Sequence, residues 1–164
     1  YPDLSGAISM GIRSGMATDW LLNDPFEIMR VMLSATRLKA GDYKALSSHD
    51  ALELATAGAA NVIGLGDRIG RLKVGYDADM VAVTLNKPHM QPFYGTATSL
   101  VWHARASDVT DSWVKGKRVL IDGNIEGIGE ADALEALKSR VNHFGEMIRG
   151  LGGRTRTSPC ECCV

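Results

Sequence analysis

The stretch from Gly70 to Val83 divides the chain into two parts of different character. Before it, apolar residues recur at helical spacing, and after it, short β-branched runs alternate with Gly, Pro and Asn, which is typical of strands and turns. Gly70 and Gly75 mark a tight turn, and residues 80–83 form an apolar run of buried-strand length. The stretch therefore predicts a hinge between a helical layer and a stranded layer.

Two helix starts are clear before the hinge. Residues 24–27, Asp-Pro-Phe-Glu, combine an N-cap, a proline at the first helical position and a capping-box glutamate, so a helix is expected over 25–37. Residues 47–50, Ser-Ser-His-Asp, open a second helix over 48–56, with Ser47 as the cap and Asp50 three residues on. The methionines of the first helix are expected to pack in the core.

After the hinge, apolar runs separated by turn residues predict strands at 80–85, 100–102, 109–114 and 117–121. Lys115-Gly116-Lys117 is expected to form the tight turn between the last two strands, and Asp122-Gly123 to end the series. A further strand signal covers residues 12–17, although Gly15 and polar neighbours interrupt it.

The last part of the chain predicts one amphipathic helix, over 131–149, followed by a glycine-rich stop. The tail, residues 154–164, holds all three cysteines. Their spacing would suit a soft metal but lacks the second ligand pair of a structural zinc site. We expect the tail to be disordered and its cysteines to be dispensable for folding.

Composition narrows the class of protein. Hydrophobic residues make up 45% and charged residues 23%, as in a soluble globular protein, and no long uncharged apolar run suggests a membrane span. A net charge of -1 gives no electrostatic surface for nucleic acid or an anionic membrane, so a small-molecule substrate is expected. No signal peptide is visible and no cysteine lies in the predicted core, which favours a cytoplasmic protein.

Several of these motifs resemble the metal-dependent amidohydrolase superfamily. Residues 70–79 read Gly-x-Leu-x-x-Gly-x-x-Ala-Asp, which resembles the junction where that family's chain leaves a (β/α)8 barrel and enters a small β-sandwich. Residues 86–92, Asn-x-Pro-His-x-x-Pro, resemble its deaminase branch, which includes adenosylhomocysteine/methylthioadenosine deaminases and chlorotriazine and ammeline hydrolases. The resemblance runs from about residue 10 to about residue 123.

The resemblance implies an α/β part followed by a β part. Its four segments are the last strand and helices of a TIM-type barrel, part of a composite β-sandwich, a terminal helix and a tail, at 1–66, 67–125, 126–153 and 154–164. A complete barrel needs ~250 residues, so the chain is expected to be a C-terminal fragment. Without the rest of the protein, the sandwich strands would keep an open edge and make the chain prone to associate.

One aspartate has a catalytic interpretation under this resemblance. Residues 10–19 resemble the family's Ala-Gly-Val-x-Val-x-x-Gly-Thr-Asp of barrel strand eight, with Met10 replacing the Ala and Ala17 the Gly. This implies that Asp19 binds the metal and carries a proton towards the leaving amine. Position alone favours a turn or N-cap role for Asp19, and the surrounding family pattern reverses that preference. Asn23 resembles a polar position near the substrate.

The histidines do not complete a metal site. A catalytic zinc needs at least three protein ligands, and none of the four histidines forms a His-x-His pair. His49, near a helix start, is expected to face solvent, and His89, between two prolines, to act as a structural hydrogen-bonding residue. Asp19 is then the one metal ligand that the resemblance assigns, so the chain alone is expected to hold no metal tightly and to be inactive.

Taken together, the resemblance implies a metal-dependent hydrolase of non-peptide carbon-nitrogen bonds. It would use a metal-activated water, with zinc or iron, to deaminate an amino-substituted purine, pyrimidine or triazine, and a C–Cl bond remains an alternative. The complete protein is expected to be a homo-oligomer. An alternative of a different class is a non-catalytic module that uses the sandwich and terminal helix for assembly.

Overall fold

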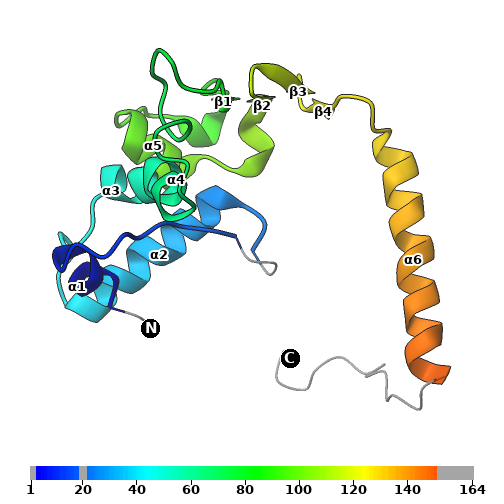
Figure 1. Ribbon diagram of the computed structural model, residues 1–164, viewed down its shortest axis with the longest axis horizontal. Coiled ribbons are helices and arrows are strands. Elements are labelled where there is room, and N and C mark those ends of the chain that lie inside the picture. Colours follow the sequence, from blue (N-terminus) through cyan, green and yellow to red (C-terminus); the bar gives the residue numbers. More distant parts are fainter. Residues whose placement is uncertain (1–2, 19–21, 151–164) are drawn as a thin grey trace. The chain divides into compact units, whose positions relative to one another are not determined.

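The computed structural model describes residues 3–18 and 22–150, excluding the side chains of 148 and 149 (Figure 1). The chain divides into two compact units, Tyr1–Asn124 and Ile125–Val164. The helices are α1 (Leu4–Ser9), α2 (Pro25–Ala40), α3 (Ser48–Glu53), the π-helix η1 (Leu54–Gly58), α4 (Ala59–Val62), the 3-10 helix η2 (Pro88–Met90), α5 (Thr96–His103), the 3-10 helix η3 (Ala106–Asp108) and α6 (Glu130–Gly150). The four-segment division at 66, 125 and 153 stays a prediction.

The helix predicted over 25–37 is confirmed as α2. The Oδ1 atom of Asp24 accepts hydrogen bonds from the backbone N–H groups of Phe26 (2.8 Å) and Glu27 (3.4 Å), which satisfies two donors of the first turn. The helix ends at Gly41, whose φ of 64° is the left-handed conformation of a glycine cap. Its buried face carries Phe26, Met29, Leu33 and Thr36, so Met29 packs in the core as expected.

The second predicted helix starts as expected but changes form. Ser47 and Asp50 make the predicted capping box, and α3 then passes into η1 and α4. In a π turn the backbone bonds run from i to i+5, which frees a carbonyl. The carbonyl of Leu54 accepts a hydrogen bond from the N–H of Met16 at 2.9 Å, so η1 holds the segment that precedes α2 in the chain.

The prediction of a strand at residues 12–17 is wrong. These residues have no secondary-structure assignment. A strand needs a neighbouring strand to form its ladder of hydrogen bonds, whereas here the neighbour of Met16 is the helical turn at Leu54. The two segments approach so closely that each carries a glycine at the contact, Gly15 on one side and Gly58 on the other. A Cβ on Gly15 would lie 2.6 Å from the Cα of Ala59.

The described strands form one sheet in the order β1-β2-β3-β4, with antiparallel pairing from β1 to β2 and from β2 to β3. Their bounds are Met80–Val83, Val109–Val114, Lys117–Ile121 and Asn124–Ile125. Three of the predicted strands are therefore confirmed. The turn at Lys115 and Gly116 is confirmed as well, with φ of 50° and 76°. Residues 122 and 123 do not end the series as expected, because β4 follows them.

Two further expectations for this part are wrong. Residues 100–102 belong to α5, because a three-residue apolar run fits a helix as well as a strand, and here Val101 is fully buried on the helix face that packs on α2 and α3. The predicted buried strand at 80–83 is largely exposed at its start, with Val81 58% accessible. Since β1 lies at one end of the sheet order, its outer edge is unpaired among the described strands.

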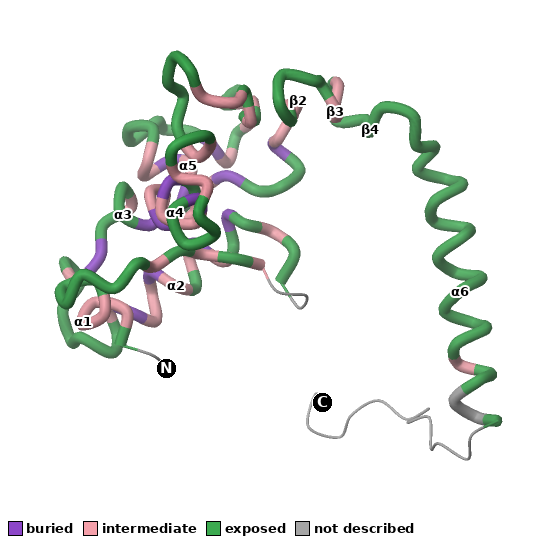
Figure 2. Tube along the Cα trace, in the orientation of Figure 1, coloured by how far each residue is buried: buried purple, intermediate pink, exposed green. Residues whose placement is uncertain are grey.

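The core lies where α2, α3 and α5 pack on one another (Figure 2). Its buried members come from both sides of the predicted hinge: Phe26, Met29, Leu33, Leu46, Ala51, Leu54, Met90, Val101 and Ala104. The hinge stretch itself contains no helix, as predicted, and its two glycines have positive φ. One hydrophobic core therefore joins sequence segments that differ in character.

We predict that Gly70→Ala destabilises the chain much more than Gly41→Ala. Both glycines have positive φ, 86° and 64°. A Cβ on Gly70 would lie 2.9 Å from the Cα of Ala57 and from the Cβ of Ala60, whereas a Cβ on Gly41 meets nothing within 4 Å. We expect a loss of about 1 kcal/mol for Gly41→Ala and about 3 kcal/mol for Gly70→Ala in urea unfolding. Equal losses would show that the hinge does not pack on η1 and α4 as described.

Candidate functional site

The candidate catalytic residue, Asp19, lies outside the described residues, so its assignment stays a prediction. Asn23, the candidate substrate-binding residue, is described and exposed. The structure also shows the contacts made on either side of residues 19–21. On one side η1 holds Met16, and on the other Asp24 starts α2.

Asp24 does more than cap α2. While its Oδ1 atom caps the helix, its Oδ2 atom accepts a hydrogen bond from the N–H of Ala106 at 2.9 Å. Six residues further along α2, the Arg30 guanidinium donates from Nη1 to the carbonyls of Val101 (3.1 Å) and Ala104 (2.8 Å). These carbonyls belong to the last turn of α5 and the residue after it, which lack helical partners. The start of α2 is thus fastened to residues 101–106, a long-range role that its capping signature does not reveal.

A second polar cluster surrounds Asp108, a fully buried carboxylate at the end of η3. The Nε2 atom of His89 lies 2.8 Å from its Oδ2, and the Nζ atom of Lys87 lies 2.9 Å from its Oδ1. The N–H of Arg105 also donates to Oδ2, at 2.9 Å. Burial opposes ionisation of this carboxylate, but these three donors more than offset it and lower the pKa of Asp108 to about 2.

This cluster settles the role expected for His89. Its ring contacts a carboxylate that is itself buried, and its hydrogen bond joins η2 to η3, as expected for a structural residue. The sequence does not single out Asp108, since its side-chain partners, Lys87 and His89, lie 21 and 19 residues away along the chain. The signal available was the resemblance at residues 86–92, which contains His89 but not the acid that it contacts.

The described residues do not supply the donor set of a metal centre. Within residues 3–18 and 22–150, no three His, Cys, Asp or Glu side chains group in a way that could hold a metal ion. His49 is exposed, as predicted, and His103 stacks on Tyr94 with ring centroids 5.9 Å apart. A metal would therefore require ligands from beyond these residues.

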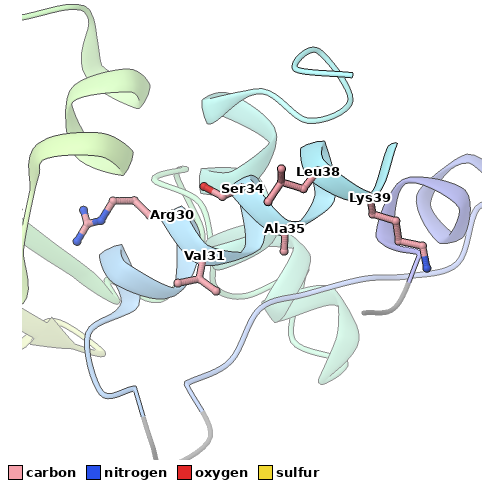
Figure 3. Close-up of a pocket in the computed structure, with 6 residues that line it drawn as sticks. All are labelled: Arg30, Val31, Ser34, Ala35, Leu38 and Lys39. Carbon is pink, nitrogen blue, oxygen red and sulfur yellow. The ribbon is translucent and has the colours of Figure 1, made fainter. Parts of the chain in front are cut away.

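A hollow on α2 offers no group for proton transfer among the described residues that line it. It is a hollow of about 690 Å³ along one face of α2, and its six lining residues are Arg30, Val31, Ser34, Ala35, Leu38 and Lys39 (Figure 3). The face is apolar at its centre and carries one cation at each end. The part of this lining that the structure describes holds no acid or histidine that could move a proton. This hollow is the outer face of one helix.

Residues 1–125 match the sequence profile of the amidohydrolase family, and the chain belongs to that family. Among its curated relatives is the 5-methylthioadenosine/S-adenosylhomocysteine deaminase of Bacillus thuringiensis strain Al Hakam, 38% identical over 136 residues that cover 78% of this chain. The chain spans about 30% of the length of the curated relatives it matches. None of the helices in the described part of the chain is long and apolar enough to cross a membrane.

Solved structures agree with this assignment. An adenosine deaminase from Xanthomonas campestris with bound zinc has a TM-score of 0.69 and 32% identity, over 76% of this chain and 28% of that one. The zinc complex of atrazine chlorohydrolase from Arthrobacter aurescens TC1 has a TM-score of 0.74 and 19% identity, over 83% and 31%, which shows a shared fold. The chain thus has the fold of a part of these proteins.

We predict that Asp108 makes the stability of the chain depend on pH between about 4 and 2. Because the folded-state pKa of about 2 lies below the ordinary value of 3.8, the carboxylate stabilises the fold above pH 4 and loses this contribution as the pH falls through 2. The difference corresponds to about 2 kcal/mol. Asp108→Asn should lower the unfolding free energy at pH 7 by at least that amount and flatten the curve below pH 4.

The matched control is Asp67→Asn, which removes an exposed carboxylate. Urea unfolding monitored by circular dichroism at pH 2.5, 4 and 7 measures both effects. If Asp108→Asn gives a pH curve parallel to that of the parent, the pKa of Asp108 does not differ between the folded and the unfolded chain, and the predicted shift is absent.

Proposed function

We propose that the chain is the C-terminal portion of a metal-dependent amidohydrolase that removes an exocyclic amino group from an N-heterocycle and releases ammonia. The observation that carries the proposal is the family match over residues 1–125, together with relatives at 32–38% identity that bear deaminase names. The fold supports it, because residues 3–18 and 22–124 pack as one core that spans both the helical and the stranded part of the match.

The sequence identity of the relatives ranks the candidate substrates. Those at 32% identity or more are named for adenine nucleosides: 5-methylthioadenosine, S-adenosylhomocysteine and adenosine. The triazine hydrolases match at 18–20% identity, which supports only the fold. We therefore place 6-aminopurine nucleosides ahead of pyrimidines and triazines as substrates.

Asp19 is the residue through which this chain would take part in the chemistry. Its carboxylate would accept a proton from the attacking water and deliver it to the departing nitrogen, so that the amine leaves as ammonia rather than as an amide anion. Asn23, which is exposed, would donate or accept a hydrogen bond at the substrate. The contacts at Met16 and Asp24 would hold the chain on both sides of these two residues.

The zinc present in two of the related structures would need a site that the described residues do not provide. We propose that its histidine ligands come from the portion of the family protein that precedes this sequence, which would also complete the barrel. The isolated chain would then bind no metal tightly and release no ammonia. A zinc or iron ion bound there would lower the pKa of a water molecule.

The experiment is to supply the missing portion. A chimera that joins the N-terminal part of the Bacillus thuringiensis relative to this chain should bind metal and release ammonia from 5′-methylthioadenosine. Asp19→Asn in the chimera should lower kcat by about three orders of magnitude or more with an unchanged melting temperature, because the amide keeps the shape but loses the basic oxygen. Asp67→Asn is the control and should leave kcat unchanged.

Assays of a panel of aminopurines, aminopyrimidines and aminotriazines, with metal analysis of each sample, complete the test. An Asp19→Asn chimera that turns over as fast as its parent would show that Asp19 is a turn residue. Ammonia release by the isolated chain would overturn the proposed dependence on a preceding portion.

A further inference from the structure

The two oxygens of Asp24 have different partners, and only one of them is needed to cap α2. Its Oδ1 atom accepts both hydrogen bonds of the cap, from Phe26 and Glu27, whereas its Oδ2 atom accepts the hydrogen bond from Ala106. Serine and asparagine cap helices as well as aspartate does, but each offers a single side-chain oxygen. The second oxygen of Asp24 therefore serves a purpose other than capping.

The N–H group that Oδ2 binds belongs to a well-held segment, residues 104–108, which we call the η3 anchor. The N–H of Thr84 donates to the carbonyl of Asp108 at 2.9 Å, and the Nζ atom of Lys87 donates to the carbonyl of Ser107 at 3.0 Å. The buried carboxylate of Asp108 also pairs with Lys87 at 2.9 Å. The η3 anchor is therefore fixed by contacts that do not involve α2.

On the α2 side, the η3 anchor receives two side chains. Besides the Oδ2 atom of Asp24, the Arg30 guanidinium donates to the carbonyl of Ala104 at 2.8 Å. Arg30 lies in the second turn of α2 and holds the body of the helix, whereas Asp24 lies directly before its first residue. Asp24 is thus the contact that fixes the entry into α2, and the residue that precedes it is Asn23.

We propose that Asp24 is a positioning residue for substrate binding, because its Oδ2 bond to the η3 anchor holds the backbone next to Asn23. The inference rests on the proposed function, in which the Asn23 amide forms a hydrogen bond with the substrate. An exposed amide on an unfixed backbone would lose conformational entropy when the substrate binds. Fixing that backbone in advance removes part of this cost, so it raises the affinity for the substrate without changing the chemical step.

The kinetic test uses the chimera described above, with 5′-methylthioadenosine as the substrate. Asp24→Ser keeps a capping oxygen for α2 but has no second oxygen for Ala106. It should raise KM about 10-fold and leave kcat within about twofold, because it weakens binding of the ground state and the transition state equally. The matched control is Ser47→Ala, which removes the N-cap of α3, where the cap partner is Asp50. It should change neither KM nor kcat.

A double variant separates positioning from a general structural effect. Asn23→Ala should raise KM by itself, and Asn23→Ala with Asp24→Ser should have the same KM as Asn23→Ala alone, because no amide is left to position. If Asp24 acted independently of Asn23, the two effects would instead multiply. An unchanged KM in Asp24→Ser, a fall in kcat alone, or multiplied effects in the double variant would each overturn the proposal.

A measurement on the 164-residue chain itself does not depend on deaminase activity. NMR relaxation should give the Asn23 backbone N–H an order parameter of about 0.85 in the parent and below about 0.6 in Asp24→Ser, while Phe26 keeps its parent value. Ala106→Pro removes the donor instead of the acceptor and should have the same effect. The proline is compatible with the backbone, because Arg105 before it is already extended, with φ of -131° and ψ of 161°.

The two measurements keep this inference distinct from the proposed function. A parent chimera that releases no ammonia, together with a loss of order at Asn23 in both variants, would count against the proposed function and leave the Asp24 contact supported. An active chimera whose Asp24→Ser variant keeps the parent KM would do the reverse. If Asn23 keeps its order in Asp24→Ser and in Ala106→Pro, the positioning role is wrong.

Discussion

The Asp24 carboxylate carries the contact on which the arrangement of the first unit depends. One of its oxygens caps α2 and the other accepts a hydrogen bond from Ala106, 82 residues further along the chain. Arg30 adds hydrogen bonds from the same helix to the carbonyls of Val101 and Ala104. Since backbone groups at the end of α5 need partners, these side chains satisfy them and fix α5 against α2.

Asp108 extends this connection into the stranded part. Its buried carboxylate takes hydrogen bonds from His89 and from the backbone of Arg105, and an ion pair from Lys87. The next residue begins β2, whose pairing with β1 leads back to the glycine-rich hinge. The helical residues before the hinge and the stranded residues after it therefore pack as one unit. The polar contacts and the shared core of Met90, Val101 and Leu33 join the two parts.

Structural features that depend on neighbouring residues could be predicted from the sequence, whereas those that depend on contacts between distant residues could not. The caps at Asp24 and Ser47 and the turn at Lys115 and Gly116 were predictable, because each depends on residues within one turn. Residues 100–102 were not, since three apolar residues carry no period, and the 12–17 segment lacked the neighbour that a strand needs. The pairing of His89 with Asp108 is nonlocal. The family was recognisable because its motifs recur in order, whereas Asp19 lies outside the described residues.

Native-state hydrogen exchange tests most directly whether the first unit is one body held by these contacts. Amides of α2, α5 and β2 should exchange through one common opening, with the same free energy and the same dependence on urea, because the Asp24, Arg30 and Asp108 contacts and a single core link them. If the β2 amides instead exchanged through an opening of lower free energy and weaker urea dependence than those of α2, the hinge would separate two independent parts, and the account would be wrong.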